Sequence, residues 1–426
     1  MKKQILAIVF SLFLIPVFLL VNLGRTSAAV STLAYTSFDV GDSTMRVRSI
    51  QSDGTVDTQL SSGIDAMEGA WEVIWSPDGT KIAYSVSDVG GIPSNLYVME
   101  ADGSNETAIT TSGFSGVYGV SWSPDSSKLA FIESDDGGAT YNIYSANADG
   151  TSKTQLSNGD SDTCPKWAST NSKIIFVSQR DADYELYSMN PDGSGEVNIT
   201  STTGADGFFS GTFCSFDISP DGSTIAFSSD RSDPGTTTQL YSMNISGGSV
   251  TALTAYGAGS MSITPSWSNN GTQIAFGSNQ HNIAGGVSAF QVYSMTSSGD
   301  SETQLTSLGA NIFMSTQLLG GVDWSPDDSQ IAFASTRNGG QIQAFIMSAD
   351  GSNQTQLVAT NMSYRATWQP SSSSPTPTPT PSSGSSSSSS AATLAETGDS
   401  FYWLYIVALV LSGAGVIGLT KRLARR

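Results

Sequence analysis

The sequence predicts an all-β protein, specifically a β-propeller built from four-stranded blades, and three observations lead to this prediction. A motif that begins WSPDG returns along the chain at steps of 44 to 57 residues. Each repeat contains four short segments of strand character, separated by turns rich in Gly, Pro, Asp and Asn. Charged residues make up only 13% of the chain, a composition that suits short strands and turns better than long helices. Repeats of this length with four strands each are typical of propeller blades.

The first two strands of each repeat form its most regular part. Residues 75–84 read WSPDGTKIAY, with an aromatic residue at the end of an apolar strand and a turn after it. Pro sets φ in that turn, Asp-Gly permits a tight reversal, and the next segment alternates with the period of two expected of a strand. The pattern begins again at Trp122, Trp167, Ile218, Trp267 and Trp324.

The third and fourth strands complete each repeat. Residues 95–103, NLYVMEADG, show the third strand and the second glycine turn. Three-residue segments such as AIT from Ala108 and TQL from Thr154 form a short fourth strand. Four antiparallel strands joined by tight turns therefore account for each period.

The two ends of the repeat region complement each other. Residues 33–37, 46–50 and 57–60 match strands two, three and four of a repeat, whereas the first strand is missing. Residues 364–370, YRATWQP, supply a first strand at the other end. Pairing the two ends closes the ring and removes two exposed sheet edges. We therefore expect seven blades, with six as the alternative because the first repeat is the least regular.

The repeat WSPDG…IAF…LY…ADG…LT resembles the WD-like repeat of the TolB β-propeller family over about residues 31–370. This resemblance implies the propeller fold. It leaves the function open, because the family includes envelope proteins, accessory domains of peptidases and surface binding modules. A structural role in the envelope, like that of TolB itself, is one alternative that the resemblance implies.

The N-terminal segment has the features of a secretory signal peptide over residues 1–29. Lys2 and Lys3 precede an apolar run, and small residues follow it, which suits cleavage after Ala29 or Ala28. An uncleaved membrane anchor is the alternative, and both interpretations predict export.

The C-terminal segment contains four parts in order. Residues 371–393 are nearly all Ser, Pro, Thr, Gly and Ala, which predicts a disordered stalk. The pentapeptide LAETG follows, and after it come an apolar stretch, 401–419, and a basic tail, 421–426. The apolar stretch is long enough for a transmembrane helix, and the basic tail is expected on the cytoplasmic side.

This order resembles the sorting signal that sortase transpeptidases of Gram-positive-type bacteria recognise. The resemblance implies recognition of Leu394, Ala395, Glu396, Thr397 and Gly398. It further implies cleavage between Thr397 and Gly398 and transfer of the new carboxyl group to an amine of the cell-wall peptide. Ala395 stands where the commonest form has Pro, which leaves open which sortase acts. A single-pass membrane anchor is the alternative, and both place the propeller at the extracellular surface.

The net charge of −19, from 37 acidic and 18 basic residues, disfavours nucleic acid as a partner. Solubility outside the cell explains this charge, and we expect a monomer whose partner is an extracellular protein or glycan.

Few residues have the chemistry of a catalytic site. His281 is the only histidine and lies in an ordinary polar connection, so a Ser-His-Asp site is not expected. The recurring aspartates sit in the WSPDG turn, where the carboxylate caps its own backbone; they are Asp78, Asp125, Asp221 and Asp327. We expect no catalytic residues and no enzyme activity. The alternative is a glycan hydrolase or lyase with carboxylates in the propeller channel.

No metal or other cofactor is expected. The segment DADYE, with Asp181, Asp183 and Glu185, could offer oxygens to calcium. It lacks the central glycine and the spacing of a twelve-residue calcium loop, so calcium is only an alternative.

The cysteines and the aromatic residues lead to further predictions. Cys164 and Cys214 each precede the first-strand motif of adjacent repeats, so a stabilising disulfide is one expectation and two small buried residues the other. The repeated tryptophans occupy one strand position, which indicates packing between blades. Phe208, Phe209 and Phe213 cluster in an irregular insertion and form our candidate contact loop. Together these features predict a surface-anchored binding module.

Overall fold

The structure is a computed structural model. It describes residues 30–39, 44–61, 69–87, 93–110, 116–134, 140–158, 161–170, 173–181, 183–209, 213–280, 290–307, 321–337, 342–358 and 362–371. All of these residues belong to the compact unit Met1–Thr376. The predicted signal peptide, sortase pentapeptide and transmembrane segment lie outside the described residues.

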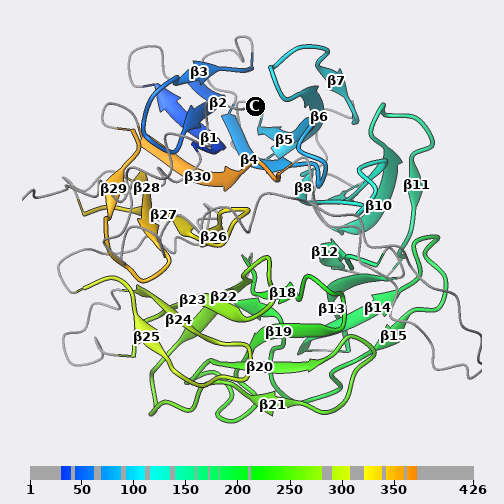
Figure 1. Ribbon diagram of the computed structural model, residues 1–426. Helices are drawn as coiled ribbons and strands as arrows, with labels where there is room; N and C mark the ends of the chain where they lie inside the picture. Colours follow the sequence, from blue (N-terminus) through cyan, green and yellow to red (C-terminus); the bar gives the residue numbers. More distant parts are fainter. Residues whose placement is uncertain are drawn as a thin grey trace, which may run out of the picture. The chain divides into compact units, whose positions relative to one another are not determined.

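Seven four-stranded antiparallel sheets form the seven blades of a β-propeller, which confirms the predicted fold class (Figure 1). Blade 1 consists of β30 (Met362–Trp368), β1 (Thr32–Asp39), β2 (Thr44–Gln51) and β3 (Thr58–Gln59). Blade 2 consists of β4 (Gly69–Trp75), β5 (Lys81–Ser87), β6 (Pro93–Glu100) and β7 (Thr107–Ala108). Blade 3 consists of β8 (Tyr118–Trp122), β9 (Lys128–Glu133), β10 (Asn142–Asn147) and β11 (Thr154–Gln155).

The other four blades repeat this order. Blade 4 consists of β12 (Thr163–Trp167), β13 (Ile174–Asp181), β14 (Asp183–Met189) and β15 (Val197–Asn198). Blade 5 consists of β18 (Phe216–Ile218), β19 (Thr224–Ser229), β20 (Gln239–Asn244) and β21 (Thr251–Ala252). Blade 6 consists of β22 (Ser262–Trp267), β23 (Gln273–Ser278), β24 (Gln291–Thr296) and β25 (Thr303–Gln304). Blade 7 consists of β26 (Asp323–Trp324), β27 (Gln330–Ser335), β28 (Gln343–Ser348) and β29 (Thr355–Gln356). Two short strands, β16 (Phe208–Phe209) and β17 (Phe213–Cys214), pair in the connection from blade 4 to blade 5.

The C-terminal strand closes the ring as expected. β30 pairs antiparallel with β1, with Leu33 opposite Trp368 and Ala34 opposite Thr367. Figure 1 shows β30 (orange) beside β1 (blue), at the place where the ends of the repeat region meet. The strand missing from the first repeat is thus supplied by the last, and the blade count is seven.

The period-two pattern of the second strand explains how the blades pack. In β5, Ile82 and Tyr84 pack in the interface with blade 1, whereas Ala83 between them packs in the interface with blade 3. Successive side chains of a strand point to opposite faces of the sheet. This strand therefore presents large side chains to the preceding blade and a small side chain to the following blade. The six tryptophans of the first-strand position are buried in these interfaces, as predicted; they are Trp75, Trp122, Trp167, Trp267, Trp324 and Trp368.

The WSPDG turns cap themselves as the sequence predicted. The Oδ1 atom of Asp78 accepts hydrogen bonds from the Ser76 hydroxyl at 2.6 Å and from the Thr80 amide at 3.0 Å. The second turn of each blade packs against the blade before it. A Cβ atom on Gly103, which has φ +85°, would lie only 2.6 Å from the Leu60 carbonyl oxygen. Only glycine fits this close approach at a positive φ.

The described part of the chain contains no helix with the length and apolar character to cross a membrane. The predicted span, 401–419, lies outside that part.

Candidate functional site

The carboxylates of the inner strands serve the ring itself. Glu72 on β4 is buried and accepts a hydrogen bond from the Val120 amide of the next blade at 3.2 Å. Asp217 on β18 accepts from the Trp267 amide at 2.9 Å. The same contact recurs in blade 7, where Asp323 accepts from the Trp368 amide at 2.9 Å. These inner-strand acids therefore link each of their blades to the next one.

Other inner-strand polar groups act in the same way. Ser121 on β8 accepts a hydrogen bond from the Trp167 amide at 3.1 Å. The Nζ atom of Lys166 on β12 donates to the Phe216 carbonyl at 2.8 Å and lies 3.0 Å from Asp217 Oδ1. The hydrogen bonds and the ion pair of these side chains thus join neighbouring blades and oppose sliding of one sheet past another.

An arginine motif recurs at the end of the second strand in blades 4, 5 and 7, where the sequence reads Ser-x-Arg. In each case Nε of the arginine donates to the serine hydroxyl, at 2.9 Å for Arg180, 3.1 Å for Arg231 and 3.2 Å for Arg337. Each guanidinium group lies over an aromatic ring, 4.8 to 5.0 Å from its centre. Cation–π contacts and the serine hold the three groups in the same place.

The three arginines differ in their counter-ions. Arg180 binds both carboxylate oxygens of the fully buried Asp162, at 2.8 and 2.9 Å. Arg231 binds the fully buried Asp206 at 2.8 Å. Arg337 donates to Gln354, and its Nη2 atom is buried without a hydrogen-bond partner among the described residues. Burial lowers the pKa of Arg337. The sequence analysis missed this motif, although the recurrence of Ser-x-Arg signals it.

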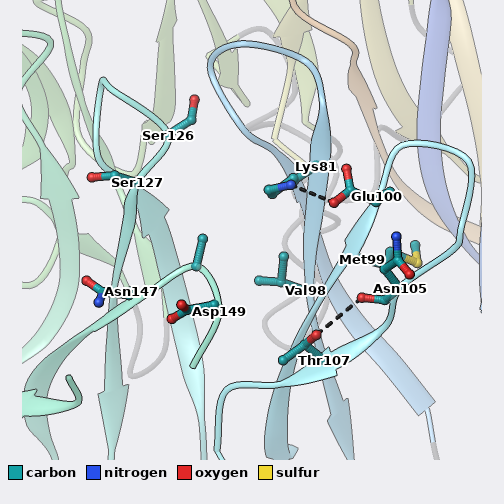
Figure 2. A pocket seen from close by; sticks show the side chains of 11 residues that line it. Lys81, Val98, Met99, Glu100, Asn105, Thr107, Ser126, Ser127, Asn147 and Asp149 are labelled. Carbon is teal, nitrogen blue, oxygen red and sulfur yellow. Dashed lines mark hydrogen bonds and ion pairs between the residues drawn. The ribbon is translucent and has the colours of Figure 1, made fainter. Parts of the chain in front are cut away.

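An open groove lies in the seam between blades 2 and 3, and we call it the seam groove (Figure 2). Its volume is about 580 Å³, within the usual range of small-molecule sites. Blade 2 contributes Lys81, Val98, Met99, Glu100, Asn105 and Thr107 to its lining. Blade 3 contributes Ser126, Ser127, Asn147, Ala148 and Asp149. Figure 2 shows the two sets facing each other across the seam.

The charges of the seam groove are largely balanced. Lys81 Nζ lies 2.7 Å from Glu100 Oε1, so these two groups form an ion pair at the edge. Hydrogen bonds from the hydroxyl and the amide of Thr151 lower the pKa of Asp149, which keeps this exposed carboxylate ionised. The remaining polar side chains are amides and hydroxyls, which both donate and accept hydrogen bonds. The groove can therefore bind a neutral polar ligand, and the Asp149 carboxylate can accept hydrogen bonds from its hydroxyl groups.

The sequence-predicted residues fall into two groups. Cys164 and Cys214 form a disulfide with their Cα atoms 5.5 Å apart, which ties β12 to β17. On β16, Phe208 pairs with Cys214 of β17 and Phe209 pairs with Phe213. The structure describes the backbone of these three phenylalanines and not their side chains. The residues outside the described part are His281, Ala29 and the pentapeptide Leu394 to Gly398.

The residues considered for calcium do not share one site. Glu185 is buried, whereas Asp181 and Asp183 are exposed on the same hairpin. Asp181 accepts hydrogen bonds from Tyr187 and Asn198. Within the described ranges, no cluster of three or more His, Cys, Asp or Glu side chains is placed to hold a metal ion.

Comparison with known proteins identifies one family. The family described as the TolB beta propeller domain matches residues 23–209 and 211–371. No curated protein matches the chain.

Several solved structures are similar to this chain at low sequence identity. TolB from Acinetobacter baumannii has 18% identity and a TM-score of 0.46, with 71% of this chain and 83% of that chain covered. An oligogalacturonate lyase from Vibrio parahaemolyticus has 14% identity and a TM-score of 0.54, with 75% and 90% covered. A puromycin-hydrolysing peptidase from Mycobacterium tuberculosis has 12% identity and a TM-score of 0.56, with 77% and 53% covered.

Proposed function

Because the chain belongs to the TolB β-propeller family, we propose that it is an exported propeller, anchored at the cell surface, that binds an extracellular glycan in the seam groove. The observation that carries this proposal is the lining of the groove by amide and hydroxyl side chains between two rigid blades. A protein ligand is the alternative occupant.

The groove has the chemistry that a sugar ring requires. Sugar hydroxyls donate and accept hydrogen bonds, and Asn105, Asn147 and Thr107 offer both kinds of group. Ala148 adds a small apolar surface for the C–H face of a sugar. The blades hold these residues on strands and tight turns, so little conformational entropy is lost on binding.

The contacts of the acidic residues on the inner strands favour binding without turnover. Glu72, Asp217 and Asp323 each accept an amide of the next blade. Turning such a carboxyl group toward a substrate would break its contact with the next blade. The alternative activity, a glycan hydrolase or lyase, uses the same fold in the Vibrio enzyme, and at 14% identity that similarity concerns the fold alone.

Surface anchoring is the second part of the proposal. The sequence of Leu394 to Gly398, with the apolar stretch and the basic tail that follow, supports transfer of Thr397 to the cell wall. The low-complexity segment 371–393 would then hold the propeller away from the wall. A structural envelope protein without a ligand is the alternative role.

The test compares two tryptophan variants of the full-length protein. Ser127 lines the groove, and Ser223 occupies the same turn position in blade 5. Neutral hexose and N-acetylhexosamine oligosaccharides are titrated by calorimetry, with reducing ends and unsaturated products assayed in parallel. We expect saturable binding that Ser127→Trp abolishes and Ser223→Trp retains, without product. Binding unaffected by Ser127→Trp would overturn the seam groove as the site, and product release would identify an enzyme.

A further inference from the structure

Glu185 in blade 4 stands where blades 5, 6 and 7 have glutamine. Glu185 pairs with Ser178 in the same register as Gln239 with Ser229 and Gln291 with Ser278. In blades 5 and 6, the glutamine Oε1 atom accepts a hydrogen bond of 2.7 Å from Thr254 or Thr306.

The corresponding threonine of blade 4, Thr200, donates to Glu185. In blades 5 and 6, a neutral amide therefore accepts the hydrogen bond of the threonine at this position. Blade 4 places an ionisable group there instead.

A second carboxyl group lies beside Glu185. The Thr202 amide donates to Glu185 Oε1 at 2.8 Å, and the Thr202 hydroxyl donates to Asp206 Oδ2 at 2.9 Å. Glu185 is 2% exposed and Asp206 is fully buried. One threonine thus bridges two carboxyl groups that water does not reach.

The charges around this pair do not balance if both groups are ionised. Arg231 is the cation paired with Asp206, at 2.8 Å. Asp230 adds a further carboxylate and accepts hydrogen bonds from the Ala205 and Gly235 amides. Tyr184 packs against the hydrophobic residues between blades 4 and 5, and burial raises its pKa, so it is neutral. Among the described residues, Arg231 is therefore paired with Asp206, and no ion pair joins a cation to Glu185 or Asp230.

We propose that Glu185 retains a proton beside Asp206 and that the two groups form a pH-sensitive latch, which we call the proton latch, that holds residues 200–209 on blades 4 and 5. The segment is fastened to both blades. The Asp206 amide donates to the Tyr184 carbonyl of blade 4 at 2.7 Å, and the Gly207 amide donates to the Ser228 carbonyl of blade 5 at 2.8 Å. The segment ends with β16, which pairs with β17, and the disulfide joins β17 to β12.

The direction of the pH effect follows from the environment. Burial, with the negative charge of Asp206 added to it, raises the pKa of Glu185 to about 7 against the hydrogen bonds from Thr200 and Thr202. The folded latch then binds a proton that the opened segment releases at a lower pH. The latch is therefore closed in acid, and it weakens as the pH rises through about 7, when two buried negative charges repel each other.

Hydrogen–deuterium exchange of the full-length protein at pH 5.5 and 8.5, corrected for intrinsic exchange rates, tests the latch. We expect protection of residues 200–209 to fall about tenfold or more between these pH values. Glu185→Gln, which copies the residue of blades 5 and 6, should keep its protection at pH 8.5. Residues 254–261, which follow the fourth strand of blade 5 and meet Gln239, serve as the internal control and should not respond to pH.

A second measurement separates the latch from any change in folding. In protein labelled with carboxyl-¹³C glutamate, one resonance should titrate with a midpoint near pH 7 and be absent from Glu185→Gln. The proposal is overturned if every glutamate titrates below pH 5.5. It is equally overturned if Glu185→Gln loses protection at pH 8.5 as the wild type does. Neither outcome depends on glycan binding, so the latch and the proposed function fail independently.

Discussion

Ile175 on β13 and Ile218 at the end of β18 pack together in the interface between blades 4 and 5, in positions that alanine and tryptophan occupy in the other six interfaces. The other six pairs are Ala34 with Trp75, Ala83 with Trp122, Ala130 with Trp167, Ala226 with Trp267, Ala275 with Trp324 and Ala332 with Trp368. Two side chains of intermediate size replace one small and one large side chain. The substitution of the recurrent tryptophan is therefore compensated across the interface, in keeping with dense packing of the core.

This pairing predicts non-additive mutations. Ile175→Ala leaves a cavity and should destabilise the protein by about 2–5 kcal/mol, whereas Ile218→Trp overpacks the interface by about 1–3 kcal/mol. The double variant restores the alanine–tryptophan pair of the other interfaces. Its loss of unfolding free energy should therefore be smaller than the sum of the losses of the two single variants. Chemical denaturation of all three variants measures this coupling. Strict additivity would show that the two positions do not compensate each other.

Among the WSPDG-type turns that the structure describes in full, two have a residue other than glycine at the left-handed position. Asp328 has φ +57° and accepts hydrogen bonds from the Asn269 and Asn270 amides of blade 6, at 2.6 and 2.9 Å. Asp328→Gly loses these hydrogen bonds, but it relieves about 1 kcal/mol of backbone strain. Asp328→Ala loses the same hydrogen bonds and does not relieve the strain. We expect melting temperatures in the order wild type, glycine variant, alanine variant.

Ser126 provides the matched case for this prediction. It has φ +58°, and its hydroxyl accepts one hydrogen bond, of 3.1 Å, from the Asp78 amide. Ser126→Gly should therefore be nearly neutral, since one lost contact offsets the relief of strain. Equal losses at both positions would contradict the role assigned to the Asp328 carboxylate.

The recurrent arginines should differ in their tolerance of methionine. Arg180→Met leaves the buried Asp162 without its cation and should cost about 3–5 kcal/mol. Arg337→Met retains the contact with the aromatic pair and removes a guanidinium group that has no carboxylate partner in the described structure. We expect a change within about 1 kcal/mol, of either sign. Thermal melts of the two variants check this contrast, and equal destabilisation would refute it.

The disulfide should contribute strongly to stability. Cys164 and Cys214 are 50 residues apart, and closing a loop of this length lowers the entropy of the unfolded chain by an amount worth about 4 kcal/mol. Replacing both cysteines with serine should lower the denaturation midpoint accordingly. Reduction of the wild type should produce the same shift, while reduction of the double variant should have no effect.

Anchoring predicts a defined C-terminus. Cell-wall fragments from the native host should contain a peptide that ends at Thr397 and is joined to a wall amine. Thr397→Ala should retain the chain to Arg426 in the membrane fraction. Mass spectrometry of both fractions tests this, and an intact wild-type chain in the membrane would leave a membrane-tethered propeller instead.

The sequence alone determined the fold because the repeat is local. The spacing of Trp75, its turn and the strand after it recurs often enough to show the blade, and the unmatched strand at each end shows how the ring closes. The roles of the turn aspartates and of the tryptophans also followed, since each depends on contacts that the period itself specifies.

The tertiary structure alone decided which side chains meet across blades. Glu185 and Asp206 are 21 residues apart, and nothing in the repeat indicates that they meet; the carboxyl pair exists because the connection between two blades turns back over β14. The seam groove likewise joins residues of two blades whose local sequences look like every other turn. A repeating pattern specifies strands and their neighbours, whereas the side chains of these sites acquire their chemistry only from their placement beside another blade.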